Sequence, residues 1–269
     1  MFRSCVFLGL FLLAACSSRD EVFVIDALPA QAVAHRAFVA TKRVPNDNGW
    51  FGADRSEQMR YMALDVSVPP DRKPGQIRHL KGLNGRTAEQ DFAVTQRLDY
   101  QGQPDFTRAL RQALQQQPPQ SRDVMLYVHG YNNSFSDGVY RTVQMKHDLR
   151  VDGVAVHYSW ASAANPLGYT YDRDSVLFSR DGLEQLLYDL AAAQPDRIVL
   201  VGHSLGTMLV METLRQIDIA RPGWADRNLG GVILLSSDLD VEVFEAQAAR
   251  MSALPQPFVV FVSSRDRAL

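Results

Sequence analysis

Five short, continuously apolar segments alternate with helical patterns in the second half of the chain. The apolar runs are residues 124–128, 154–158, 198–201, 232–235 and 258–262. Strands buried on both faces of a parallel sheet have this unbroken character, because helices cover both faces. Helical segments are expected between the runs, at 137–150, 174–193, 204–217 and 241–251. The alternation predicts a doubly wound, mostly parallel α/β sheet, with its core over residues 123–269.

The preceding residues, 36–122, predict a β-rich extension of this sheet followed by a helix. Strand-like segments at 36–44 and 61–68 each stop at a proline, and 92–100 is a third candidate strand. The composition of residues 45–49 is that of a loop. A helical pattern then runs from Phe106 to Leu114, and two prolines end it.

The composition of the chain excludes several classes of protein and of binding partner. The chain has 269 residues, of which 46% are apolar and 22% charged, with a net charge of −2. The apolar content excludes a disordered chain, and the charge balance gives no electrostatic footprint for nucleic acid. Neither a metal-ligand spacing nor a glycine-rich phosphate loop is apparent. We therefore expect no nucleic-acid partner, no metal and no cofactor.

The N-terminus has the form of a secretory signal. Arg3 precedes an apolar run, Val6–Ala15, which is far shorter than the roughly 20 residues that span a bilayer. The run ends at Leu13-Ala14-Ala15-Cys16, which resembles the bacterial lipoprotein processing box. The resemblance implies that residues 1–15 are removed, that Cys16 carries lipid, and that 16–35 form a tether. An ordinary secreted protein cut nearby, with Cys16 incidental, is the alternative.

The same resemblance implies a location. Ser17, rather than Asp, follows Cys16, which resembles the pattern sorted to the outer membrane. A lipid-anchored protein of the bacterial envelope, facing the periplasm, is therefore expected. Cys5, the other cysteine, would leave with the signal, so the mature domain would contain no free thiol and no disulfide.

A candidate nucleophile lies where the apolar run 198–201 ends. Gly202-His203-Ser204-Leu205-Gly206 follows this strand and opens directly into a helical segment. A serine on such a strained turn needs small neighbours, and the helix N-terminus favours developing negative charge. Ser204 is the expected nucleophile of an acyl-transfer reaction. The alternative is a tight turn in which Ser204 serves as the helix N-cap.

A candidate oxyanion loop follows the apolar run 124–128. Val128-His129-Gly130-Tyr131-Asn132 ends that strand. The backbone N–H groups of Tyr131 and Leu205 would then face the carbonyl oxygen of a substrate. The alternative is a β-turn with a hydrogen-bonded, structural His129.

These residues together resemble the α/β-hydrolase superfamily, and more closely an uncharacterised group of bacterial esterase/lipase-like proteins. The likeness covers nearly all of the mature chain. Besides the two motifs above it includes Val39-Ala40-Thr41-Lys42-Arg43, Val66-Ser67-Val68-Pro69, Ser159-Trp160, Tyr171-Asp172-Arg173-Asp174-Ser175 and Leu235-Ser236-Ser237-Asp238-Leu239-Asp240.

The resemblance implies a triad in the chain order serine, acid, histidine. Asp266, just after the run 258–262, is the expected acid, with Asp238 and Asp240 as alternatives. No histidine follows Ser204: the six are His35, His79, His129, His147, His157 and His203. Either the chain is a fragment that lacks the last strand, the histidine loop and the last helix, or it is a pseudo-hydrolase. The fragment is the favoured interpretation.

The expected function is therefore an envelope-anchored serine hydrolase acting on a small-molecule ester or a lipid. A non-catalytic lipoprotein and an acyltransferase on the same scaffold are the alternatives. Trp160, Tyr169 and Tyr171 could line an acyl pocket, although plain packing is favoured. For Asp172 and Asp174 we expect helix capping rather than catalysis.

Overall fold

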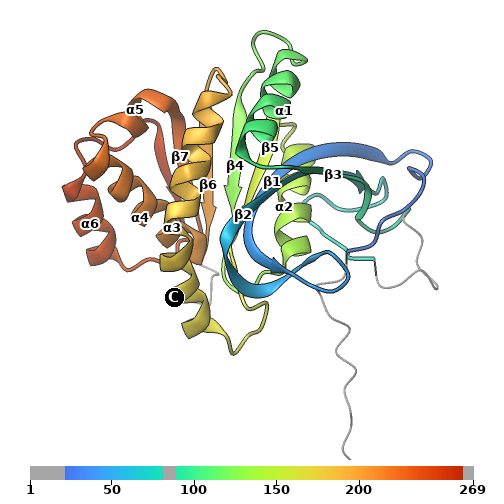
Figure 1. Ribbon diagram of the computed structural model, residues 1–269, viewed down its shortest axis with the longest axis horizontal. Helices are drawn as coiled ribbons and strands as arrows, with labels where there is room; N and C mark the ends of the chain where they lie inside the picture. The colour runs from blue at the N-terminus through green and yellow to red at the C-terminus, as the bar shows by residue number, and fades with distance from the viewer. Residues whose placement is uncertain (1–21, 81–88, 263–269) are drawn as a thin grey trace, which may run out of the picture.

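A computed structural model describes residues 22–80 and 89–262 of the chain, and its centre is an eight-stranded sheet (Figure 1). The strand order is β3-β2-β1-β5-β4-β6-β7-β8. The three strands at one edge, β1 (Val33–Pro45), β2 (Phe51–Val68) and β3 (Ala93–Tyr100), pair antiparallel. From β1 onward every pairing is parallel, through β5 (Val154–Ser159), β4 (Val124–Val128), β6 (Ile198–His203), β7 (Leu229–Leu235) and β8 (Phe258–Phe261).

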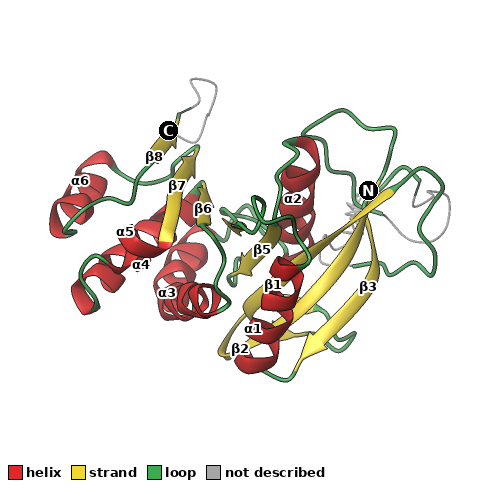
Figure 2. Cartoon of the chain, turned by 90° about the horizontal axis from the view of Figure 1, so that it is seen from above, coloured by secondary structure: helices red, strands yellow, loops and turns green. Residues whose placement is uncertain are grey.

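Helices cover the two faces unequally, as Figure 2 shows. α2 (Phe135–Asp148) lies on one face, while α1 (Gln103–Gln115), α3 (Tyr169–Ala192), α4 (Leu205–Ala220), α5 (Trp224–Asn228) and α6 (Val241–Arg250) lie on the other. The chain moves from β4 to β5 in one direction and then returns past β4 to β6. Because crossovers are right-handed, this reversal transfers the following helices to the opposite face.

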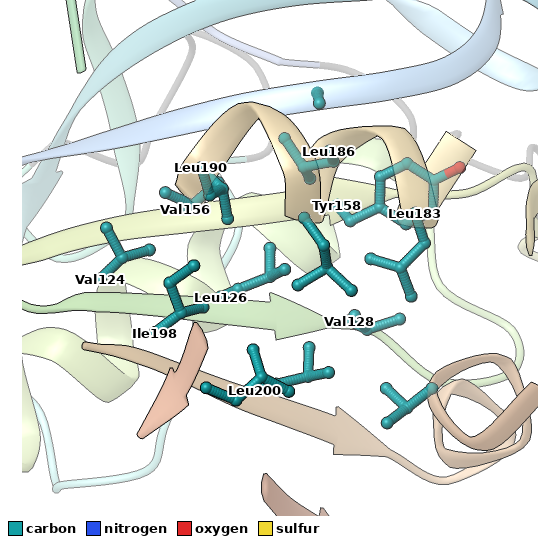
Figure 3. Close-up of a cluster of buried hydrophobic side chains, with 14 of the residues drawn as sticks. Val124, Leu126, Val128, Val156, Tyr158, Leu183, Leu186, Leu190, Ile198 and Leu200 are labelled. Carbon is teal, nitrogen blue, oxygen red and sulfur yellow. The ribbon is translucent and has the colours of Figure 1, made fainter. Parts of the chain in front are cut away.

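The main core lies between the parallel strands and α3 (Figure 3). Leu183, Leu186 and Leu190 are spaced by three and four residues, so they share one stripe of α3 and pack on the sheet. Their partners are Val124, Leu126 and Val128 of β4, Val156 and Tyr158 of β5, and Ile198 and Leu200 of β6, each at most 1% exposed. Burial of each leucine or valine side chain contributes about 1.5–3 kcal/mol.

The other face is covered only in part. α2 packs over β1, β2 and β5 and closes a second core. Over β6, β7 and β8, no helix of the described residues covers this face (Figure 2). A cavity of about 620 Å³ opens there. Apolar side chains of the sheet line much of it: Met125, Val199, Val201, Ile233, Leu235 and Phe261.

The fold confirms the predicted α/β-hydrolase-type sheet and corrects several boundaries. Every strand predicted from an unbroken apolar run is present. The strand predicted at 61–68 is wrong at its start, because β2 begins at Phe51 and continues the hairpin with β1. α3 begins at Tyr169 rather than at residue 174, and the short helix α5 was not predicted. No helix in the described ranges combines the length and the apolar character needed to cross a bilayer.

Candidate functional site

Ser204 occupies a strained turn between β6 and α4. Its φ of 50° lies in the left-handed region, which is uncommon for a residue other than glycine. The surrounding hydrogen bonds fix this geometry. The Ser204 N–H donates to the Leu235 carbonyl at 2.9 Å, and the Ser204 carbonyl accepts from the backbone N–H and the hydroxyl of Thr207 at 2.9 and 2.7 Å. A strained residue persists where its neighbours over-determine it, and such residues cluster at functional sites.

The glycines around Ser204 are required by close backbone contacts. A Cβ at Gly206 would lie 2.8 Å from the Val128 carbonyl oxygen and still closer to the carbonyl oxygen of His129. At Gly130 it would lie 2.7 Å from the Cβ of Ser204. The loop after β4 therefore lies directly against the turn that carries Ser204.

This contact places Tyr131 and Leu205, the two predicted oxyanion residues, next to the Ser204 turn. Leu205 is the first residue of α4, so its N–H has no acceptor within the helix and lies at the positive end of the helix dipole. Tyr131 directly follows Gly130, the residue that contacts Ser204. Amides from two segments beside one serine are the arrangement that stabilises a tetrahedral oxyanion. The roles of Ser204, Tyr131 and Leu205 stay predictions.

His129 is a structural residue of this loop. It is fully buried and stacks on Trp160, with ring centroids 4.7 Å apart, while the Trp160 indole donates to the His129 carbonyl at 2.8 Å. Its ring nitrogens lie 2.9 Å from the Gly130 carbonyl oxygen and 3.0 Å from that of Trp160. Burial, with the nearby Arg43 guanidinium, holds the pKa of His129 well below its usual range. A weakly basic ring occupied in this way supports the loop and cannot serve as the base.

The other histidines have different surroundings. His157 is buried against α2, and burial lowers its pKa to about 3. His35 contacts His147, with ring nitrogens 2.9 Å apart, and His79 pairs with Asp137. The Nδ1 of half-buried His203 lies beside Gly130. His35, His79, His147 and His157 are thus engaged by other groups, whereas His203 directly precedes Ser204.

The three candidate acids have different surroundings. Asp266 lies outside the described residues. Asp240 caps α6, because its carboxylate accepts from the N–H groups of Glu242 and Val243 at 2.9 and 3.1 Å. Asp238 lies nearer to the elbow: its N–H is 3.4 Å from the Ser204 carbonyl oxygen, and its carboxylate accepts from the Tyr169 hydroxyl at 3.1 Å.

The aromatic residues divide between core and rim. Trp160 is fully buried and Tyr171 donates its hydroxyl to the Ala53 carbonyl, so packing explains both. Tyr169 is 39% exposed and meets Tyr131 edge to face at 5.3 Å. Tyr169 contacts both Tyr131 and Asp238, and the three form a partly exposed rim near the Ser204 turn.

The capping roles predicted for Asp172 and Asp174 are wrong, because α3 begins earlier than expected. Its N-cap is Gly168, and Asp174 lies exposed on the helix surface. Asp172 is fully buried, and its carboxylate accepts from the N–H groups of Asn132 and Ala163 and from the Ser162 hydroxyl. It therefore ties the loop after β4 to the loop after β5.

Sequence reasoning also missed Arg43, which lies near the end of β1 and contacts the same loop. Its side chain is 1% exposed and donates to the carbonyls of Gly52, Asn133 and Ser162. The available signal was the appearance of both Arg43 and Asp172 in the segments that carry the family resemblance. No group of three or more potential metal-ligating side chains occurs in the part of the chain that the structure describes.

A mostly parallel sheet with a Gly-x-Ser-x-Gly turn from a central strand into a helix defines the α/β-hydrolase class. The chain belongs to a family of that class, described as "Alpha/beta hydrolase of unknown function (DUF900)", which matches residues 104–269. No curated protein matches the chain. No solved structure matches it either.

Proposed function

We propose that the protein is a serine hydrolase that cleaves a carboxylic ester or a related acyl bond. The observation that carries the proposal is the strained Ser204 turn in backbone contact with the loop after β4. A hydrolase fold alone does not define an activity, so the argument depends on this site.

The proposed reaction proceeds through an acyl-enzyme. The Ser204 oxygen attacks the ester carbonyl and gives its proton to a base, and the N–H groups of Tyr131 and Leu205 hold the resulting oxyanion. The tetrahedral intermediate collapses, the bond to the alcohol oxygen breaks, and the alcohol leaves with a proton. Water then attacks the acyl group and releases the acid. Loss of one oxyanion donor costs about 3–4 kcal/mol of barrier, so the loop geometry is essential.

A base is required because a serine hydroxyl is a weak nucleophile at its ordinary pKa. Five of the six histidines are engaged by other groups, so none of these five is proposed as the base. The acid that orients the base is proposed to be Asp266, with Asp238 and Asp240 as the alternatives.

The test is hydrolysis of p-nitrophenyl esters of increasing acyl length. Wild type and Ser204→Ala are compared with a matched variant, Ser237→Ala, whose hydroxyl lies 2.8 Å from that of Thr207 at the same end of the sheet. We expect activity in wild type and Ser237→Ala and its loss in Ser204→Ala. Equal rates in Ser204→Ala, or no hydrolysis of any ester by wild type, would favour the non-catalytic alternative. Transfer of the acyl group to an added alcohol in preference to water would favour an acyltransferase.

We also propose that the protein is anchored in the bacterial envelope through lipid on Cys16. Two or more acyl chains give stable membrane anchoring, and the substrate would then be an ester or a lipid at that surface. The test is incorporation of labelled palmitate with membrane fractionation, comparing Cys16→Ala with the matched variant Cys5→Ala. Loss of label and release from the outer membrane only in Cys16→Ala are expected. Equal labelling of the two variants would contradict the proposal.

A further inference from the structure

The loop after β4 is tied down by charged residues that lie outside the Gly-x-Ser-x-Gly turn. The loop holds a second residue with positive φ, Asn132, whose φ is 55°. Asparagine adopts this region more readily than most residues, and further contacts fix the loop here. The contacts that do so come from two distant parts of the chain.

The first contact is the buried carboxylate of Asp172 on α3. One oxygen accepts from the Asn132 N–H at 3.0 Å and from the Ser162 hydroxyl at 2.6 Å. The other accepts from the Ala163 N–H at 2.6 Å. Every one of these contacts requires an acceptor, so the ionised carboxylate suits the position and an amide does not.

The second contact is the buried guanidinium of Arg43 at the end of β1. It donates to the Asn133 carbonyl at 2.8 Å, to the Ser162 carbonyl at 3.0 Å and to the Gly52 carbonyl at 2.9 Å. A planar fork with five N–H groups can join three segments in this way, whereas a lysine ammonium cannot.

Ser162 connects the two charged groups. Its hydroxyl donates to Asp172 and accepts from the Asn133 N–H at 3.1 Å, while its carbonyl accepts from Arg43. Asn132 and Asn133 are therefore held from both sides, one and two residues beyond Tyr131.

We propose that Arg43 and Asp172 are positioning residues that hold the Tyr131 amide in place beside Ser204. This inference rests on the proposed function, because it assigns the loop a task in that reaction. Arg43 lies outside residues 104–269, which match the family. The antiparallel extension therefore contributes a residue to the site as well as an edge to the sheet.

The test is hydrogen exchange measured by mass spectrometry on the peptide that contains residues 129–134. In Asp172→Asn, the new NH₂ group faces the N–H of either Asn132 or Ala163, so in both orientations the side chain no longer joins the loop after β4 to the loop after β5. Exchange in this peptide should therefore rise about tenfold. The strand peptide 124–128 should stay protected. Asp174→Asn, an exposed acid on the same helix, is the matched control and should match wild type.

Arg43 is tested with Arg43→Lys and Arg43→Met against Arg36→Met, which changes a partly exposed arginine of the same strand paired with Asp65. Both Arg43 variants should raise exchange in 129–134, because the lysine keeps the charge but lacks the fork. Arg36→Met should leave it unchanged. Wild-type exchange in Arg43→Lys would show that a positive charge alone holds the loop, and would overturn the role proposed for the guanidinium.

Ser162→Ala serves as a milder variant if Asp172→Asn unfolds. Unchanged exchange at 129–134 in the folded Asp172 or Ser162 variants would overturn the proposal, as would an equal rise in 124–128. If esters are hydrolysed, kcat should fall with KM little changed. Because the exchange experiment needs no catalysis, it also tests this inference if the proposed function fails.

Discussion

Gly206→Ala tests the close approach of α4 to the loop after β4. A Cβ at Gly206 would overlap the His129 carbonyl oxygen and lie 2.8 Å from that of Val128. Both obstacles are backbone atoms at the end of a central strand, so the upper end of the overpacking range applies, about 3 kcal/mol. Alanine is a better helix former than glycine, which offsets up to about 1 kcal/mol of this cost. The expected net loss in the free energy of unfolding is therefore about 2 kcal/mol.

The matched variant is Gly102→Ala at the N-cap of α1. A Cβ there would meet only the Cδ of Pro104, at 3.9 Å, which is an ordinary van der Waals distance. Alanine is a poorer N-cap than glycine, so we expect a loss of less than about 1 kcal/mol.

The assay is urea unfolding followed by circular dichroism, with the melting temperature as a second measure. Gly206→Ala should lower the melting temperature by about 4–8 °C, and Gly102→Ala should lower it by less. Equal losses in the two variants, or wild-type stability in Gly206→Ala, would refute the argument that a rigid backbone contact fixes this turn.

Three further predictions concern the surroundings of the site. The pKa of His157 is lowered to about 3 by burial, so only the unfolded chain gains its proton as the pH falls below about 6.5. The free energy of unfolding should therefore decline from pH 6.5 towards 3, by up to about 1.4 kcal/mol per pH unit from this group. His157→Phe should make this decline smaller, as measured by urea unfolding at pH 7 and pH 5. An identical decline in wild type and His157→Phe would contradict the lowered pKa of His157. Trp160→Phe removes the donor to the His129 carbonyl and should cost about 1–3 kcal/mol in urea unfolding, whereas wild-type stability would show that this bond contributes nothing. Asp240→Ala removes the cap of α6 and should cost about 1 kcal/mol without slowing fluorophosphonate labelling, whereas a large loss of labelling would favour Asp240 over Asp266 as the acid.

The sequence predicted the parts of the fold that depend on local pattern. The strands β4 to β8 were found because each contains an unbroken apolar run. Burial on both faces accounts for this run in β4 and β5, whereas β8 is partly exposed in the described structure. The first ten residues of β2 were missed because they show no such pattern. They pair with the end of β1, where Pro45 lies opposite Phe51. The register between the two strands shifts twice along this part.

The same distinction applies to the site. The Ser204 turn could be predicted, because the need for small residues between a strand and a helix is a local steric rule. Arg43 and Asp172 could not be assigned from pattern, because a charged residue is ordinarily exposed. Their burial depends on carbonyls and amides that lie 90 and 40 residues away along the chain.

The proposed function requires Ser204 to be a nucleophile. This is measured by reaction with a fluorophosphonate followed by intact mass and peptide mapping, in which the serine oxygen bonds to phosphorus and fluoride leaves. We expect one adduct per chain, on the peptide that contains Ser204, and none in Ser204→Ala. An adduct on another residue, equal labelling of the two proteins, or no adduct on wild type would contradict it.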